Sequence, residues 1–504
     1  MREPVDWPTR DPLAHRAAAT PDRTALVDTE TDREWSVRDL DATVDRLAAR
    51  LTAIGPGDTD ETEGRVGLLA ATSAGFVAAV HAILRTGETV VPLNLQLTDA
   101  ELSDHLARTA PDVLVCERDT EERAVSLFDG PVASLDRPET EGVSGLRPAK
   151  TAETNVEPPA WDRRDEAVVL FTSGTTGRAK GVRLTLGNLV ASATASAFRL
   201  GVAPGDRWLC CLPTYHMGGL APILRTALYG TTLVVQPSFD ADKTARVLDT
   251  SGATGVSLVP TQLHRLLETG WHPPESLSAV LLGGAPASED LLERALARDV
   301  PVYPTYGMTE TASQVATATP AQVATDPETV GQPLVFTEVT VVDDSGNPVE
   351  RGESGEVVVD GPTVTPGYLD AEETATATGE YGLHTGDVGR RDADGLLYIL
   401  GRVDDTIVTG GENVHPSDVA DALRSHPGVA DAAVVGLPDE EWGERVAAMV
   451  VPGTDRVTVA EVESHARERL ASYKVPKTIA FAPELPRTAS GTLDREAVAQ
   501  RLRE

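Results

Sequence analysis

The stretch Phe171-Thr-Ser-Gly-Thr-Thr-Gly-Arg-Ala-Lys-Gly-Val182 follows an apolar segment, Ala167–Phe171, whose pattern predicts a buried β-strand. Residues 172–181 contain three glycines, four hydroxyl side chains and one lysine, Lys180. Glycines let backbone N–H groups approach an anion closely, and the hydroxyl and ammonium groups add donors. The stretch therefore predicts a polyphosphate-binding loop, with a plain surface loop as the alternative. It is not a Walker A loop, because Gly181 follows the lysine where Ser or Thr would bind Mg²⁺.

Apolar strands and helical patterns alternate on both sides of this loop. Val66–Ala70 is expected to be a strand that leads into a helix at about 76–85, and Asp112–Cys116 is expected to be another buried strand. This alternation predicts an α/β fold, with α+β parts, built on largely parallel sheets. Residues 117–165 are rich in charge and proline, so we expect loop and weak structure there.

The pattern changes toward the C-terminus. Short, turn-linked strands predict a β-rich subdomain at about 330–400, in which the low-complexity segment Thr374–Thr378 is expected to be a loop. A new α/β pattern follows, and it is long enough for a small independent domain. The sequence therefore predicts a small C-terminal domain over residues 406–504, with its boundary to residues 1–400 at about 401–405.

Charge excludes some classes of partner. The 504 residues include 78 Asp and Glu against 44 Lys and Arg, a formal net charge of −34, and only five lysines. Such a chain would repel nucleic acids and anionic membranes. An acidic chain that keeps arginine is typical of a halophile's cytosolic protein, because high salt screens the self-repulsion. Cys116, Cys210 and Cys211 have no disulfide or metal spacing, and the N-terminus has no apolar signal segment, so we expect a cytoplasmic protein without stable membrane insertion.

Further motifs follow the phosphate loop in a fixed order: Gly283-Gly-Ala-Pro286, Tyr306-Gly-Met-Thr-Glu310, Thr385-Gly-Asp387 and Gly401-Arg-Val-Asp-Asp-Thr-Ile-Val-Thr-Gly-Gly-Glu-Asn-Val-His-Pro416. Together with the loop they resemble the adenylate-forming superfamily of acyl-CoA synthetases, luciferases and peptide-synthetase adenylation domains. The resemblance spans essentially the whole chain. It implies ATP, Mg²⁺ and CoA as ligands. It also implies a large N-terminal domain of layered sheets over residues 1–400, a hinge at 401–405 and a small, mobile C-terminal domain.

The resemblance also implies a role for each motif. Adenylation converts a carboxylate into a mixed anhydride with pyrophosphate as leaving group, so the site must neutralise charge and align the reactants. Lys180, Thr309, Glu310 and His216 are implied as catalytic, and Glu310 as the Mg²⁺ ligand. The C-terminal domain would turn about Asp404 and present Gly410, Gly411 and Glu412 to CoA. The implied nucleotide-binding residues are Thr172, Ser173, Gly174, Thr175, Thr176, Gly177, Lys180, Gly283, Gly284, Ala285, Pro286, Tyr306, Thr309, Asp387 and Arg402.

Within the superfamily, three stretches are most similar to the o-succinylbenzoate–CoA ligases of menaquinone biosynthesis: Leu212-Pro-Thr-Tyr-His-Met-Gly-Gly-Leu220, Leu258-Val-Pro-Thr-Gln-Leu-His-Arg-Leu-Leu267 and Tyr306-Gly-Met-Thr-Glu-Thr-Ala-Ser-Gln314. This similarity implies 2-succinylbenzoate as the acid, with an aryl or fatty acid as the alternative. His216 would gate the acyl pocket, and Arg225 could pair a second substrate carboxylate. Ser313 and Gln314 could line the aryl or keto end. A core histidine and a helix-surface arginine are the structural alternatives.

One departure from the superfamily pattern affects the function. The superfamily ends with a Gly-Lys motif whose lysine enters the adenylation site, whereas this chain carries Thr492 at that position. The loss of one charge that stabilises the transition state would cost about 10²–10³ in rate. Lys477, Arg487 and Arg495 are candidates to replace it. A degenerate adenylate-binding protein without catalysis is therefore the second functional hypothesis.

Overall fold

The described residues form two compact units. The computed structural model describes residues 10–55, 64–146, 159–172, 179–403, 405, 407–409, 412–414, 416–439, 442–453, 457–470, 472–487 and 493–503. The first unit comprises Met1–Val339 and Val359–Leu383, and the second comprises Thr340–Val358 and His384–Glu504.

A nine-stranded sheet forms the first layer of the first unit. Its central strands run parallel, as their buried Val and Leu runs predict, and antiparallel strands lie at both edges. In spatial order the strands are β16 (Gln332–Pro333), β15 (Ala316–Thr317), β14 (Val302–Tyr306), β13 (Ala279–Leu282), β12 (Gly255–Leu258), β10 (Arg207–Cys210), β11 (Thr232–Val235), β1 (Thr24–Asp28) and β2 (Arg33–Ser36).

An eight-stranded sheet forms the second layer. Its parallel strands carry the antiparallel pair β8–β9, which places the phosphate loop between two paired strands. In spatial order the strands are β19 (Gly367–Tyr368), β9 (Lys180–Thr185), β8 (Glu166–Thr172), β4 (Thr89–Pro92), β3 (Arg65–Leu69), β5 (Val113–Cys116), β6 (Val132–Ser134) and β7 (Val143–Gly145).

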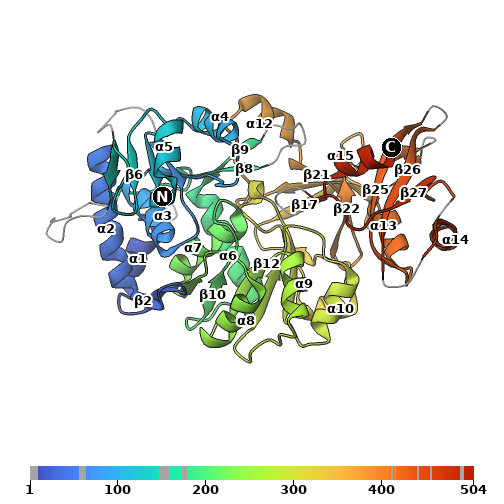
Figure 1. The fold of residues 1–504 in the computed structure, drawn as a ribbon, viewed down its shortest axis with the longest axis horizontal. Helices are drawn as coiled ribbons and strands as arrows, with labels where there is room; N and C mark the ends of the chain where they lie inside the picture. The colour runs from blue at the N-terminus through green and yellow to red at the C-terminus, as the bar shows by residue number, and fades with distance from the viewer. Residues whose placement is uncertain are drawn as a thin grey trace, which may run out of the picture. The chain divides into compact units, whose positions relative to one another are not determined.

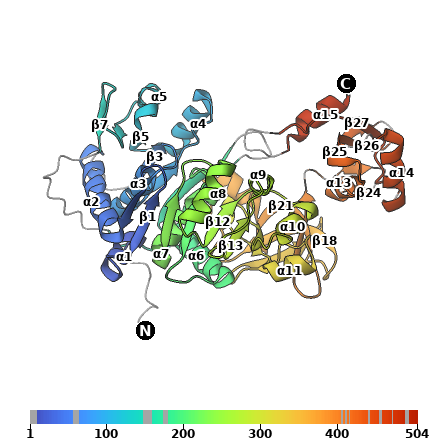
Figure 2. The same ribbon diagram turned by 60° about the horizontal axis from the view of Figure 1, so that its bottom comes forward.

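Helices cover both sheets. Figure 1 shows α8, α9 and α10 side by side, and their leucines join the strands of the nine-stranded sheet in one buried cluster. Figure 2 shows α6 and α7 as neighbours. The helices of the first unit are α1 (Pro12–Ala19), α2 (Val37–Ile54), α3 (Ala74–Thr86), α4 (Asp99–Thr109), α5 (Glu121–Leu127), α6 (Leu186–Leu200), α7 (Met217–Tyr229), α8 (Ala241–Thr250), α9 (Pro260–Glu268), α10 (Glu289–Leu296), α11 (Pro320–Thr325) and α12 (Ala371–Ala377), with short 3₁₀ turns η1 (Arg118–Thr120) and η2 (Thr309–Thr311).

Five strands within residues 338–402 form a third sheet, as the β-rich pattern predicts. Its strands are β17 (Glu338–Val342), β18 (Ser354–Asp360), β21 (Gly382–Arg391) and β20 (Thr378–Gly379), with β22 (Leu397–Arg402) also paired to β21.

A fourth sheet forms the core of the C-terminal part. Alternate residues of β25 and β26 face opposite sides, so one face packs on α13 and α14 and the other on α15. Its strands are β24 (Glu412–Val414), β23 (Ile407–Thr409), β26 (Gly443–Pro452), β25 (Val429–Asp439) and β27 (Thr478–Phe481), and its helices are α13 (Pro416–Arg424), α14 (Val459–Arg469) and α15 (Arg495–Arg503).

Two local predictions are wrong. The segment 117–165 holds η1, α5, β6 and β7, because short apolar runs extend the eight-stranded sheet despite the surrounding charge and proline. Strand β6 pairs with β5, and β7 pairs with β6. Residues Thr374–Ala377 belong to helix α12, not to a loop. The Asp370 side chain caps that helix by accepting from the backbone N–H groups of Glu372 and Glu373, which outweighs the poor helix propensity of the threonines.

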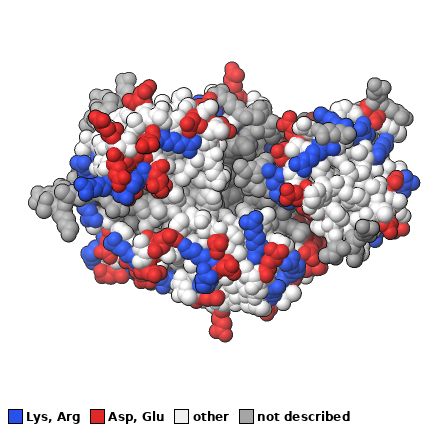
Figure 3. Space-filling view, in the orientation of Figure 1, with Lys and Arg blue, Asp and Glu red and all other residues white. Residues whose placement is uncertain are grey.

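Charged side chains of both signs are interspersed on the face shown in Figure 3. Within the ranges that the structure describes, no helix is long and apolar enough to cross a membrane.

Candidate active site

The predicted motifs of the first unit follow neighbouring strands of the nine-stranded sheet. Strands β10, β12, β13 and β14 are parallel, so their carboxyl ends meet at one edge. The segments after them contain His216, Val259, Gly283–Pro286 and Tyr306–Gln314 in turn. Ligands of open α/β sheets bind at this edge. The topology therefore gathers stretches that lie almost a hundred residues apart in the sequence, since β10 ends at Cys210 and β14 at Tyr306.

Close backbone packing explains two glycines of these motifs. A Cβ atom on Gly307 would lie 1.7 Å from the carbonyl oxygen of Ser313, and one on Gly283 would lie 2.7 Å from Cγ2 of Thr305. Ala312 and Ser313 both have positive φ, 51° and 119°. The segment 307–313 is thus a tight, strained turn, and strain of this kind concentrates at functional sites.

Lys180, Tyr368 and Glu310 form one connected group. Lys180 is the first residue of β9, and its Nζ lies 5.2 Å from the centroid of the Tyr368 ring. The Tyr368 hydroxyl donates to Oε1 of Glu310 at 3.0 Å. Glu310 is buried, and its backbone carbonyl accepts from the N–H of Thr365 at 2.7 Å. Tyr368 therefore contacts both Lys180 of the phosphate loop and Glu310, the predicted metal ligand.

Arg225 is buried, which excludes the helix-surface alternative. Only 8% of it is exposed, and burial lowers the pKa of its guanidinium. Its Nη2 donates to Ser192 Oγ at 3.1 Å, and that hydroxyl donates to the carbonyl of Ala312 at 2.7 Å. Among the described residues no carboxylate forms an ion pair with Arg225. A buried cation with no acidic partner in the described part of the chain thus contacts the Ala312–Gln314 segment through one hydroxyl, that of Ser192.

Gln314 and His216 occupy different environments. The Gln314 amide is 1% exposed, and its Nε2 donates to Thr317 Oγ1 at 2.8 Å, while Oε1 makes no hydrogen bond with a described residue. His216 is the N-cap residue of α7, and its ring contacts Tyr215 edge-on at 4.7 Å. His216 is exposed at the surface of the first unit, which argues against the core-histidine alternative, and desolvation lowers its pKa.

The second unit contains the other nucleotide motif. Arg402 Nη1 donates to Oδ1 of Asp387 at 2.9 Å and to the carbonyl of Thr385 at 3.2 Å. Asp387 and Arg402 face each other on the antiparallel strands β21 and β22. Gly386 has a φ of 68°, and its N–H donates to Oε1 of Glu356 at 3.0 Å. The other oxygen of Glu356 pairs with His384 Nδ1 at 2.7 Å, so the turn is held from both sides.

Comparison with known proteins assigns the family. The model of the AMP-binding enzymes matches residues 13–369, and the model of their C-terminal domain matches residues 418–492. The chain belongs to the AMP-binding enzyme family. It is 38% identical over 496 residues to 2-succinylbenzoate–CoA ligase of Bacillus cereus, and the match covers 98% of each chain.

Solved structures of AMP-binding enzymes agree with the fold. The o-succinylbenzoate CoA synthetase of Bacillus subtilis bound to its acyl-adenylate OSB-AMP has a TM-score of 0.87 and 34% identity, covering 97% of this chain and 98% of that one. The same enzyme with ATP and magnesium has a TM-score of 0.87 and 33% identity, with 98% and 99% coverage. The predicted superfamily and the predicted fold class, a large N-terminal domain followed by a small C-terminal one, are confirmed.

Several predicted residues of this AMP-binding enzyme lie outside the described ones. They are Ser173, Gly174, Thr175, Thr176, Gly177, Asp404, Gly410, Gly411 and Thr492, and only the backbone of Glu412 is described.

Each candidate replacement for the family lysine has a partner within the second unit. Arg495 pairs with Asp405 at 3.1 Å, Arg487 pairs with Asp431 at 3.3 Å, and Lys477 lies 3.5 Å from the ring centroid of Trp442.

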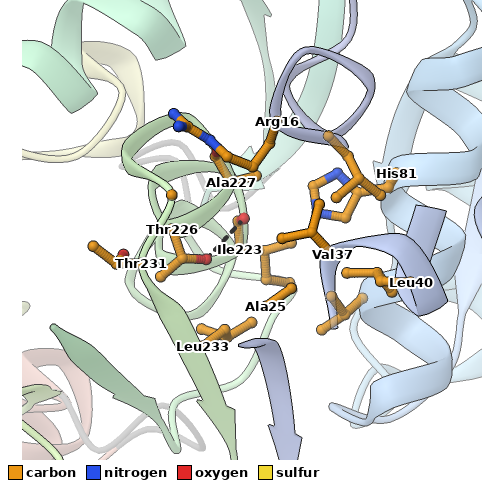
Figure 4. A pocket seen from close by; sticks show the side chains of 13 residues that line it. Arg16, Ala25, Val37, Leu40, His81, Ile223, Thr226, Ala227, Thr231 and Leu233 are labelled. Atoms are coloured by element: carbon orange, nitrogen blue, oxygen red, sulfur yellow. Dashed lines mark hydrogen bonds between the residues drawn. The ribbon is translucent and has the colours of Figure 1, made fainter. Parts of the chain in front are cut away.

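A small cavity of the first unit is separate from these motifs. It lies between α1, α2, α3 and α7, and its volume of about 20 Å³ holds about one water molecule (Figure 4). His81 lines it; the side chain is 1% exposed, Nδ1 makes no hydrogen bond with a described residue, and burial lowers its pKa to about 4. No predicted site residue lines this cavity.

Three contributors to the site were not found from the sequence. Tyr368, Ser192 and Glu356 lie in segments without motif character, 58, 120 and 30 residues from the groups that they contact. Only the pairing of distant strands and helices brings them to the motifs, so a local pattern could not reveal them.

Proposed function

We propose that this AMP-binding enzyme is an ATP-dependent acid–thiol ligase that converts 2-succinylbenzoate, ATP and CoA to 2-succinylbenzoyl-CoA, AMP and diphosphate in menaquinone biosynthesis. The observation that carries the choice of acid is Arg225. It is a buried guanidinium without an acidic partner among the described residues, and it is linked through Ser192 to the Ala312–Gln314 segment. A substrate with a second carboxylate supplies the missing anion. The similarity to 2-succinylbenzoate–CoA ligases supports the same choice.

The first half-reaction forms the acyl-adenylate. A carboxylate oxygen attacks the α-phosphorus, the bond to the β-phosphate oxygen breaks, and diphosphate leaves. In this proposal Thr172, Lys180 and the loop between them hold the β- and γ-phosphates, and Thr309 donates to the α-phosphate. Tyr306 and the Gly283–Pro286 segment would hold adenine. Preorganised donors of this kind stabilise the charge that develops in the transition state.

Glu310 fits a magnesium ion shared with phosphate oxygens. It is a buried carboxylate oriented by a hydroxyl donor, Tyr368, as carboxylate ligands usually are. Among the described residues no cluster of three or more His, Cys, Asp or Glu could hold a metal alone. Mg²⁺ favours this arrangement of one carboxylate plus substrate phosphates, and when bound it neutralises the developing phosphate charge.

The second half-reaction forms the thioester. The CoA sulfur attacks the acyl carbon, the bond from that carbon to the AMP phosphate oxygen breaks, AMP leaves and the thiol proton passes to solvent. We assign Asp387, clamped by Arg402, to the ribose hydroxyls. His216 would gate the acyl pocket, with Ser313 and Gln314 at the aryl or keto end. Gly410, Gly411 and Glu412 would receive the pantetheine arm after rotation about Asp404.

Pyrophosphate exchange in molar salt tests this proposal. The purified enzyme is given labelled diphosphate, ATP and Mg²⁺ with 2-succinylbenzoate, benzoate or a fatty acid, and thioester formation is then followed with CoA. We expect exchange and thioester formation with 2-succinylbenzoate at a kcat/KM at least about tenfold above the other acids. Faster turnover of a monocarboxylic acid would assign another substrate class. The absence of exchange with every acid, despite ATP binding, would indicate a non-catalytic adenylate-binding protein.

We also propose a cytoplasmic location. Cys116, Cys210 and Cys211 are free and buried, and burial raises the pKa of each thiol. Unpaired thiols are usual in reducing compartments.

A further inference from the structure

Helix α4 contacts both ends of the phosphate loop, at strand β8, which leads into the loop, and just before strand β9, which follows it. The loop follows Phe171 and Thr172 at the end of β8 and returns through Ala179 to Lys180 at the start of β9. The pairs Phe171–Gly181 and Thr172–Lys180 of the antiparallel ladder close its base. Helix α4 begins with a capping box between Thr98 and Glu101, so its first turn is fixed.

The His105 ring stacks on the strand that enters the loop. Its centroid lies 3.6 Å from that of Phe171, and the two rings are parallel to within 4°. His105 is buried, and burial lowers its pKa to about 4, so the ring is neutral at pH 7. Stacking of a neutral imidazole on a phenyl ring restrains Phe171, the residue before Thr172.

Arg108 contacts the strand that leaves the loop. Its Nη1 donates to the carbonyl oxygen of Ala179, and its guanidinium carbon lies 5.3 Å from the centroid of Phe171. Asp104 lies 3.5 Å from Nη1, and Glu373 lies 4.0 Å from Nη2. Two carboxylates already lie next to this guanidinium, and only 14% of the Arg108 side chain is exposed. We therefore do not assign Arg108 to direct phosphate binding.

We propose that α4 is a clamp for the phosphate loop, in which Arg108 is the positioning residue for Lys180. A trans peptide is planar, so the carbonyl of Ala179 and the N–H of Lys180 point in opposite directions. By holding that carbonyl, Arg108 fixes the orientation of the peptide that precedes Lys180. It thereby reduces the conformational freedom that Lys180 would lose on binding a triphosphate. This inference rests on the proposed function, because it takes ATP as the ligand of the loop.

Direct binding of Mg·ATP to the full-length protein in molar salt tests the clamp independently of the acid. Arg108→Gln should weaken ATP binding by about 10- to 100-fold, the range for losing one charge-assisted hydrogen bond. The KM for the acid should change less than about threefold, within the usual scatter of a distant site. Arg108→Lys keeps a charged donor and should restore most of the ATP affinity, and it remains informative if Arg108→Gln folds poorly.

Arg123→Gln is the matched control. Arg123 also neutralises an α4 carboxylate, Asp99 at 2.8 Å, and donates to the carbonyl oxygens of Leu95 and Leu97, away from the phosphate loop. It should leave the affinity for ATP unchanged. Unaltered ATP affinity in Arg108→Gln, an equal loss in Arg123→Gln, or no recovery in Arg108→Lys would each overturn the clamp. If the wild type binds ATP but does not turn over 2-succinylbenzoate, the proposed function fails while the clamp is still tested.

Discussion

Replacement of Arg225 by methionine should raise the free energy of unfolding but lower the preference of the enzyme for a dicarboxylic acid. Arg225 is 8% exposed and donates to Ser192, whose hydroxyl keeps its own acceptor, the Ala312 carbonyl, after the substitution. Removing a buried charge that has no acidic partner among the residues described by the structure should therefore raise the free energy of unfolding by about 1–3 kcal/mol.

The same substitution should weaken the use of a dicarboxylic acid. Two opposite charges at about 4 Å interact by about 4 kcal/mol at an effective dielectric constant of about 20, and a charge-assisted hydrogen bond contributes about 1.5–3 kcal/mol. We therefore expect Arg225→Met to lower kcat/KM for 2-succinylbenzoate by about 2–4 kcal/mol, or about 30- to 1,000-fold. Benzoate-type acids carry no second carboxylate, so their kcat/KM should change less than about threefold.

The assays are chemical denaturation and pyrophosphate exchange, both in molar salt. Arg199→Met is the control, because Arg199 is a half-buried residue of the same helix as Ser192 and donates instead to the carbonyl of Gln332 at 3.4 Å. It should preserve the preference for the dicarboxylic acid. Equal losses on 2-succinylbenzoate and benzoate, or a less stable Arg225→Met protein, would refute the assignment of Arg225 to a substrate carboxylate.

Three other predictions concern separate parts of the chain. Burial lowers the pKa of His81 to about 4, so between pH 6.5 and 4 the unfolded chain binds the extra proton and stability falls as the pH falls. The difference in unfolding free energy between wild type and His81→Leu should shift by about 2 kcal/mol from pH 7 to pH 5, and an unchanged difference would contradict this. Asp404→Pro fixes φ at the predicted hinge and should keep the adenylation half-reaction while losing most thioester formation. Single-turnover assays of both steps test this, and thioester formation at the wild-type rate would contradict the hinge assignment. Thr492→Lys should speed pyrophosphate exchange by at least about tenfold, because Lys477, Arg487 and Arg495 already have partners in the second unit; an unchanged rate would mean that another cation replaces the lysine.

Local sequence determined the elements and the family. Regular apolar runs predicted strands such as β3, β5, β8 and β13, since a strand buried on both faces must be apolar throughout. Motif order along the chain indicated an adenylate-forming enzyme, because glycine, hydroxyl and acidic residues at fixed places are what nucleotide chemistry requires. The prediction from sequence was wrong where one capping side chain decides the structure. Asp370 caps the first turn of helix α12 in a threonine-rich segment that was expected to be a loop.

Only the tertiary structure decided which side chains meet. The sequence is equally consistent with Arg225 on the surface of its helix. Its burial and its contact with Ser192 follow from the packing of α6 against α7 (Figure 2). Tyr368 reaches Glu310 because β19 pairs with β9, far along the chain. Arg108 reaches Ala179 because α4 packs beside the eight-stranded sheet. Such contacts join residues 33 to 71 positions apart, a separation at which short-range periodicity carries no information, so their geometry depends on strand order and helix packing.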